Sequence, residues 1–201
     1  MKNLTRALDL ECISDTKMGL IGSCYFIGFM VGALFIPRSA DLFGRRWVVV
    51  LGVAVHLIAT LLFLFAVNIE MVYVCQVLLG LQSPSTMQVS FVLITEIVGQ
   101  KYRPFYSTLI LSINATLNLI IPGYYYFVKD YIYLVYFNIA LSGVVFLALL
   151  FFLVESPRYF TSHRNFRRAR DIYNLFARRN SRQPLHETQE LLEGEKGQVD
   201  P

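Results

Sequence analysis

Three clusters of charged residues stand at the ends of apolar segments, and the chemistry that they offer is ion pairing. The clusters contain, in order, Asp41, Gly44, Arg45 and Arg46; Glu96 and Arg103; and Glu155 and Arg158. A helix N-terminus or an arginine could hold Asp41. The expected ion pairs join Glu96 and Arg103 with Arg45 or Arg46, and Glu155 with Arg158. We therefore expect a charge network at the helix ends. The alternative is that these charges only flank the helices and fix the topology.

Five apolar segments must position these clusters, and none of the five contains Asp, Glu, Lys or Arg. They cover residues 18–37, 47–67, 71–95, 105–128 and 131–154. About 20 helical residues cross the roughly 30 Å hydrocarbon core of a bilayer. Because lipid offers no partner to backbone amides, apolar runs of this length without strict alternation predict helices. The sequence thus predicts an all-α membrane protein with five transmembrane helices.

The distribution of cations predicts which side of the membrane each joint faces. Fourteen of the eighteen lysines and arginines fall between segments one and two, between segments three and four, or after segment five. The positive-inside rule places these joints in the cytosol. We therefore expect a multi-pass integral protein, in the plasma membrane, with an extracytoplasmic N-terminus and a cytosolic C-terminus.

The same pattern divides the chain into four parts. Residues 1–17 are expected to be an extracytoplasmic segment, and residues 18–154 a transmembrane bundle. Residues 155–180 contain apolar side chains at helical spacing with arginines between them, which predicts a basic amphipathic helix at the cytosolic surface. Residues 181–201 are polar and acidic, and this composition predicts disorder.

Polar residues within the third and fourth segments are candidates for lining a path. Polar groups at membrane depth are costly unless they face protein or a wet cavity. On this argument the possible path-lining residues are Gln82, Gln88, Asn114 and Asn118. Simple hydrogen bonding between helices is the alternative. A single histidine in the second segment, His56, is interpreted as a residue satisfied within the bundle rather than a ligand.

Several classes of function lack the residues that they require. No Ser/His/Asp or Cys/His arrangement lies at a plausible depth, and no His/Cys/Asp cluster has metal-ligand spacing. No Gly-x-x-x-x-Gly-Lys-Ser/Thr loop is present for a nucleotide. The basic character follows the sides of the membrane, so it does not indicate nucleic acid. We expect no enzyme activity, no cofactor and no metal; the expected partners are the lipid bilayer and a small organic solute.

Three motifs resemble those of the major facilitator superfamily. Residues 41–46 read Asp-Leu-Phe-Gly-Arg-Arg, similar to the loop signature of an acid followed by Gly-Arg-Arg. Residues 92–103 resemble the end of the fourth helix of organic cation transporters. Residues 155–158 read Glu-Ser-Pro-Arg, similar to the motif after the sixth helix of sugar porters and organic cation/anion transporters.

This resemblance implies that the five segments correspond to helices two to six of an N-terminal half. The superfamily places its solute site between two six-helix halves, so helix one and the C-terminal half would be missing partners of an incomplete chain. The implied function is transport of an organic cation-like solute by alternating access, with the charge clusters as a cytosolic latch. A sugar porter-like fragment and a non-transporting, truncated membrane protein remain the alternatives.

Overall fold

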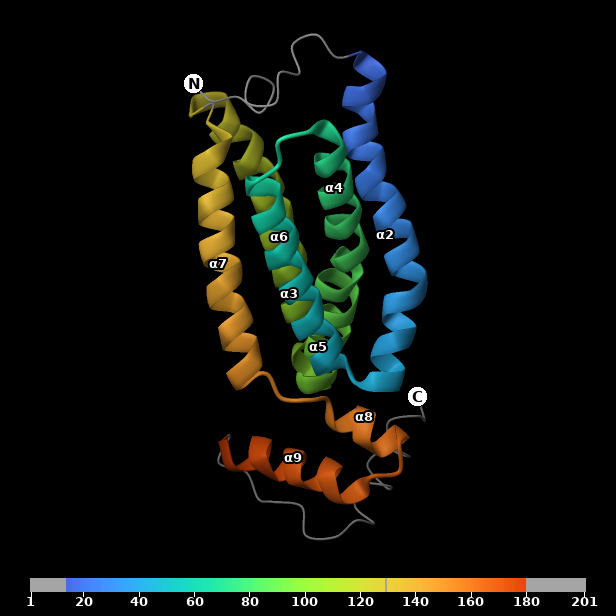
Figure 1. Ribbon diagram of the computed structural model, residues 1–201. Helices are drawn as coiled ribbons and strands as arrows, with labels where there is room; N and C mark the ends of the chain where they lie inside the picture. Colours follow the sequence, from blue (N-terminus) through green and yellow to red (C-terminus); the bar gives the residue numbers. More distant parts are fainter. Residues whose placement is uncertain (1–13, 129, 180–201) are drawn as a thin grey trace.

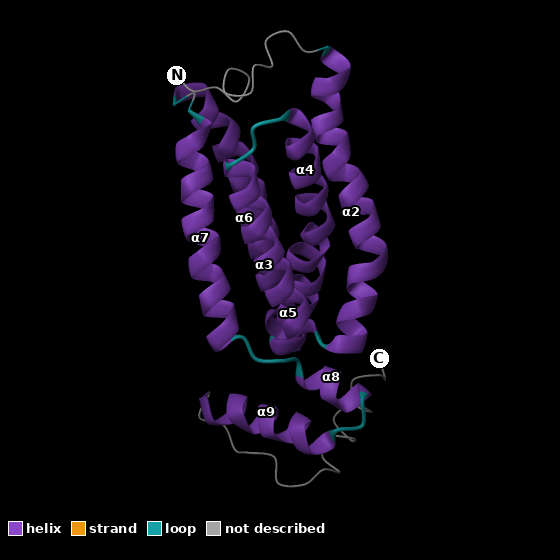
Figure 2. Cartoon of the chain, viewed as in Figure 1, coloured by secondary structure: helices purple, strands orange, loops and turns teal. Residues whose placement is uncertain are grey.

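The computed structural model describes residues 14–128 and 130–179, and five long helices dominate this part of the chain (Figure 1). They cover Asp15–Phe43, Arg45–Leu64, Ile69–Ile97, Gln100–Phe127 and Tyr131–Phe152. Each is long and apolar enough to cross a membrane, which confirms the five predicted segments. Short loops join them, and the described residues contain no strand (Figure 2).

The first helix, α2 (Asp15–Phe43), extends six residues beyond the predicted end at Pro37. A proline removes one backbone donor, but a membrane helix tolerates this loss where other groups satisfy the carbonyls. Two residues after Pro37, the Ser39 hydroxyl donates to the Phe35 carbonyl at 2.8 Å. The helix ends at Gly44, directly before α3 (Arg45–Leu64).

The third long helix changes its pitch in the middle. It comprises α4 (Ile69–Pro84), the π-helical turn η2 (Ser85–Val89) and α5 (Ser90–Ile97). Hydroxyl groups satisfy carbonyls around this wide turn, with Ser85 donating to Gln82 at 2.7 Å and Thr86 to Ser83 at 3.1 Å. Pro84 is thus accommodated within a continuous transmembrane helix.

Glycines bring α2 and α4 into close contact. A Cβ atom on Gly28 or Gly32 would collide with the backbone carbonyl of Val77 or Leu81. Gly80 of α4 is in the same situation against the Tyr25 carbonyl. Two helices packed backbone to backbone gain dispersion contacts that bulkier residues would prevent.

The other long helices pack less closely. Helix α7 (Tyr131–Phe152) packs against α3, whereas α6 (Arg103–Phe127), which follows the 3-10 turn η3 (Gln100–Tyr102), contacts mainly α5 and η3. No residue of α6 is buried. The body of the bundle therefore consists of α2, α3 and the α4–η2–α5 helix, with α7 beside α3.

Two shorter helices follow the bundle, α8 (Pro157–Ser162) and α9 (Phe166–Arg179). They lie beyond the end of the bundle at which the α2–α3 turn and α5 are found (Figure 1). We call this the charged end. The amphipathic helix expected within 155–180 is thus present, but as two helices. The tail 181–201 and most of the segment 1–17 lie outside the described residues.

Candidate functional site

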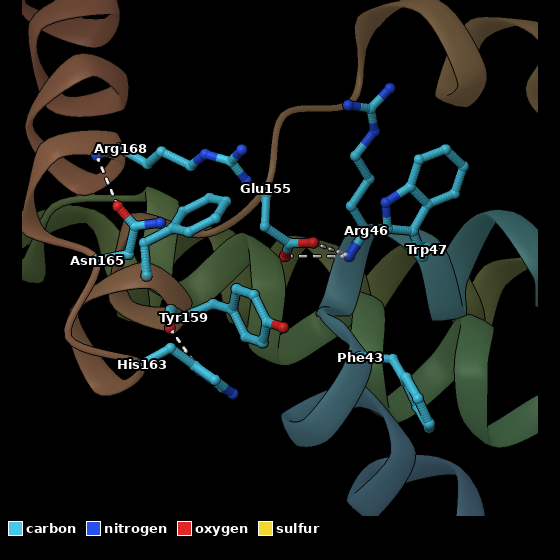
Figure 3. A pocket seen from close by; sticks show the side chains of 9 residues that line it. Phe43, Arg46, Trp47, Glu155, Tyr159, His163, Asn165 and Arg168 are labelled. Carbon is cyan, nitrogen blue, oxygen red and sulfur yellow. Dashed lines mark hydrogen bonds between the residues drawn. The ribbon is translucent and has the colours of Figure 1, made fainter.

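Glu155 binds the N-terminus of α3. Its carboxylate accepts the backbone N–H groups of Arg45 at 3.0 Å, Arg46 at 3.1 Å and its own neighbour Ser156 at 3.1 Å. Only 8% of Glu155 is exposed. The first amides of a helix have no partner within the helix, and the helix dipole is positive there, so a buried carboxylate is well placed. Glu155 therefore fixes the loop after α7 to the start of α3 (Figure 3).

Gly44 makes this contact possible. Its φ of +100° lies in a region that residues with a side chain rarely adopt. A Cβ atom at this position would also lie 2.6 Å from Oε2 of Glu155. The glycine of the loop is thus required both by its backbone conformation and by the carboxylate beside it.

Arg45 joins the loop to α5. Its guanidinium forms an ion pair with Oε2 of Glu96, and it contacts Oδ1 of Asp41 at 3.3 Å. The side chains are exposed to very different degrees, 18% for Arg45, 8% for Glu96 and 68% for Asp41. Because water screens an exposed pair, the pair with Glu96 is the one on which the local structure depends.

Ser156 connects the two buried carboxylates. From the sequence, this residue was recognised only as part of the motif at residues 155–158, without a role of its own. Its hydroxyl donates to Oε2 of Glu96 at 2.7 Å and accepts the backbone N–H of Arg158 at 3.2 Å. The residue is fully buried. The signal for this role is a serine directly before a proline, the pattern of an N-cap followed by the first residue of a helix.

Arg46 binds the C-terminal end of α7. Its Nη2 atom donates to the Leu150 carbonyl at 2.9 Å, and its guanidinium lies 5.3 Å from the centre of the Trp47 ring. Its Nε atom is buried without a hydrogen-bond partner among the described residues. A cation at the last carbonyls of a helix is favourable because unpaired C=O groups and the negative end of the dipole lie there.

The two remaining candidates, Arg103 and Arg158, do not pair with the buried carboxylates. Nε of Arg103 donates to the Val98 carbonyl at 3.3 Å, at the end of α5. Arg158 is exposed and contributes its backbone N–H to the Ser156 cap. The expected pairing of Glu155 with Arg158 is absent from the described residues, because the carboxylate is occupied by backbone donors of α3 and Ser156.

The four possible path-lining residues lie in different surroundings. Gln82 is buried, whereas Gln88, Asn114 and Asn118 are exposed. The two asparagines donate to carbonyls of their own helix, Asn114 to Ile110 at 3.0 Å and Asn118 to Asn114 at 2.9 Å. The structure therefore does not bring the four amides together in one cavity.

A hydrogen-bonded relay crosses the middle of the bundle instead. The Gln82 amide lies 3.1 Å from Nδ1 of His56, and Nε2 of that ring lies 3.0 Å from Oδ1 of Asn138. An amide nitrogen only donates, so Nδ1 accepts and Nε2 carries the proton given to Asn138. His56 is hydrogen-bonded within the bundle, as expected. The sequence did not predict its two partners, Gln82 and Asn138, which lie on other helices. His56 and Asn138 line a cavity of about 220 Å³.

These features define a polytopic helical membrane protein whose loops are joined by a charge network at one end. The family model described as Major Facilitator Superfamily matches residues 3–190. The chain belongs to this superfamily.

Its similarity to individual members is moderate. The chain is 32% identical to organic cation/carnitine transporter 2 of Homo sapiens over 173 residues, which is 86% of this chain and 31% of that protein. Solute carrier family 22 member 4 of Mus musculus is also 32% identical, over 86% of this chain and 31% of its own length. Solute carrier family 22 member 2 of Homo sapiens is 26% identical over 97% of this chain and 35% of its length. The chain thus spans about a third of the length of these relatives.

Proposed function

We propose that this chain supplies helices of a carrier that moves a small, organic cation-like solute across the membrane by alternating access. The network at the charged end would act as the latch of the inward side, closed when its carboxylates are desolvated. The names of the relatives, organic cation/carnitine transporter 2 among them, support this class of solute. Fourteen cations on one side support a cytosolic position of the charged end.

One observation carries the latch proposal. The buried carboxylates Glu96 and Glu155 join three separate segments, α5, the start of α3 and the loop before α8, through Arg45 and Ser156. Such a network stabilises one arrangement of the helices and is lost in any arrangement that separates them. A difference of a few kcal/mol between two conformers then decides which conformer dominates.

Solute uptake tests the proposal. Radiolabelled tetraethylammonium and carnitine would be offered to cells that produce the chain alone, and to cells that produce a chimera. In the chimera, this chain replaces the matched 173-residue stretch of the human transporter. We expect the chimera to take up at least one of the two solutes above the background of empty cells.

Two controls give the experiment its meaning. Surface biotinylation must show that the chimera reaches the membrane, and labelled glucose tests the sugar-porter alternative. A chimera at the surface that moves none of the three solutes would contradict the proposal. Uptake by the chain alone would show that these helices suffice; uptake by the chimera only would show that the remaining length of the relatives is required.

A further inference from the structure

Two cavities meet at the charged end and share a wall. The first, of about 400 Å³, lies between the start of α3 and the helices α8 and α9, and we call it the polar cavity because Arg46, Glu155 and Arg168 line it together with aromatic residues. The second, of about 280 Å³, is an almost wholly apolar groove between α2, α3 and α4, with Ile36, Leu51 and Leu81 on its sides. The side chains of Phe43 and Trp47 line both. The two cavities are thus neighbours that share these two aromatic residues, one with charged residues in its lining and the other almost wholly apolar.

Two arginines reach the polar cavity from opposite sides. Arg46 comes from α3 and Arg168 from α9, as Figure 3 shows. Nε of Arg46 is buried and without a hydrogen-bond partner among the described residues. Guanidinium groups bind phosphate through parallel, charge-assisted hydrogen bonds. Two residues of the type that binds phosphate therefore line the cavity, although Nη2 of Arg46 already donates to the Leu150 carbonyl and its Nε is buried.

The negative charge of Glu155, which also lines this cavity, does not fully neutralise the two arginines. Glu155 accepts three backbone N–H groups, two of them from the positive end of α3. Its charge is thus stabilised by groups that belong to the protein. One net positive charge remains in the cavity, from Arg46, Arg168 and Glu155.

The aromatic residues place the junction of the cavities at the level of the lipid headgroups. Trp47 is 51% exposed at the first turn of the transmembrane helix α3, and Phe43 is 72% exposed at the last turn of α2. Tryptophan is favoured at the membrane–water interface, where its ring lies among the headgroups. The apolar groove then lies at the depth of the acyl chains.

We propose that the two cavities form a binding site for an anionic glycerophospholipid. The phosphate binds between Arg46 and Arg168, and one acyl chain lies in the groove beyond Trp47. Because Arg46 belongs to α3 and Arg168 to α9, the bound lipid holds α9 against the bundle. This assignment does not depend on which solute is transported, nor on which side of the membrane the charged end faces.

Trp47 is the only tryptophan in the sequence, so its fluorescence reports on the site without any label. The full chain would be reconstituted in phosphatidylcholine vesicles that contain increasing fractions of phosphatidylglycerol with brominated acyl chains, which quench tryptophan on contact. Brominated phosphatidylcholine is the reference lipid. We expect about a tenfold preference for phosphatidylglycerol, the scale of about one charge-assisted hydrogen bond.

Variants separate a built site from general attraction to a negative surface. Arg168→Gln is expected to reduce the preference to within about twofold, since one of the two phosphate ligands is lost. Arg167→Gln is the matched control, because this exposed neighbour on α9 does not line the cavity. Val55→Phe fills the groove and is expected to reduce quenching by brominated phosphatidylglycerol even though both arginines are present.

Two results would overturn the proposal. Equal losses in Arg167→Gln and Arg168→Gln would show that the basic helix attracts anionic lipid without a site. Reversal of the quenching by inorganic phosphate would show an anion site without an acyl chain. A preference that is lost in Arg168→Gln, persists in Arg167→Gln and is insensitive to inorganic phosphate supports the lipid site.

Discussion

Arg45 of α3 and Glu96 of α5 form an ion pair whose side chains are 18% and 8% exposed. The same arginine also contacts Asp41, whose side chain is 68% exposed. Arg45 thus pairs with one buried carboxylate, Glu96, and one exposed carboxylate, Asp41. Only the loss of Glu96 removes a buried partner of this arginine.

The two partners are therefore expected to respond differently to neutralisation. Glu96→Gln leaves the largely buried Arg45 charge with only its exposed partner Asp41, and we expect a cost of about 3–5 kcal/mol. Asp41→Asn removes a solvent-screened pair, and we expect a cost below about 1 kcal/mol. Thermal unfolding of the purified chain in detergent, followed by circular dichroism, measures both. Equal losses of thermal stability would contradict this ranking.

A substitution at Gly44 tests the loop conformation. Gly44→Ala combines a positive φ with a Cβ atom 2.6 Å from the Glu155 carboxylate, so we expect a loss of about 1–3 kcal/mol. Gly99→Ala is the matched control, since its φ is −58° and no atom lies within 4 Å of the added Cβ. Melting temperatures and resistance to protease compare the two. If Gly44→Ala is as stable as Gly99→Ala, the loop can adopt another conformation and the prediction is wrong.

Ser156 is expected to stabilise the start of α8. Ser156→Ala removes both the cap of the Arg158 amide and the hydrogen bond to Glu96, at a cost of about 1–2 kcal/mol. Hydrogen exchange of the Arg158 amide is expected to accelerate. The control is Ser162→Ala at the far end of α8, where an exposed hydroxyl bonds to the Tyr159 carbonyl. Unchanged exchange at Arg158 would mean that Ser156 does not cap the helix in solution.

The close packing of α2 and α4 depends on Gly80. Gly80→Ala places a methyl group against the Tyr25 carbonyl, so the two helices must separate. We expect a loss of at least about 1 kcal/mol, as for other overpacked contacts. Gly22→Ala on α2 has open space around its added methyl group and serves as the control. Thermal unfolding distinguishes the two variants; equal stability would contradict the close approach.

Labelling of single cysteines tests the proposed orientation. The three native cysteines are first replaced, as Cys12→Ser, Cys24→Ala and Cys75→Ala. In this background, Lys101→Cys lies in the exposed turn η3 at the charged end, and Val67→Cys in the loop at the opposite end of α3. A membrane-impermeant maleimide is expected to label position 67 in intact cells, and position 101 only after permeabilisation. The reverse pattern would place the charged end outside the cell.

The sequence predicts the five spans well because span length is set by the thickness of the bilayer. The end of α2 is less predictable, because a proline such as Pro37 ends a soluble helix but not a membrane helix whose carbonyls find other donors. Hydropathy also cannot show where the backbone hydrogen bonds change from the α-helical to the π-helical pattern, at Ser85–Val89. The hydroxyl groups of Ser85 and Thr86 bind carbonyls of the same helix at that turn.

The charged residues were predictable by type but only in part by partner, since Glu96 pairs with Arg45 as expected. Glu155 binds backbone amides of α3 rather than Arg158. Side-chain types in a sequence do not show which backbone amides a carboxylate will bind. The relay through His56 was missed for a related reason. Its partners Gln82 and Asn138 lie on other helices, and only the rotation of those helices brings them to the ring.

Helix α6 satisfies its own polar side chains, since Asn114, Thr116 and Asn118 all donate to carbonyls one turn earlier. None of these bonds reaches another helix, so a change of neighbour breaks none of them. The α2–α4 pair is the opposite case, because its interlocked backbones resist sliding. The backbones of α2 and α4 thus fix these two helices against each other, whereas these three polar side chains of α6 do not specify which helix packs beside it.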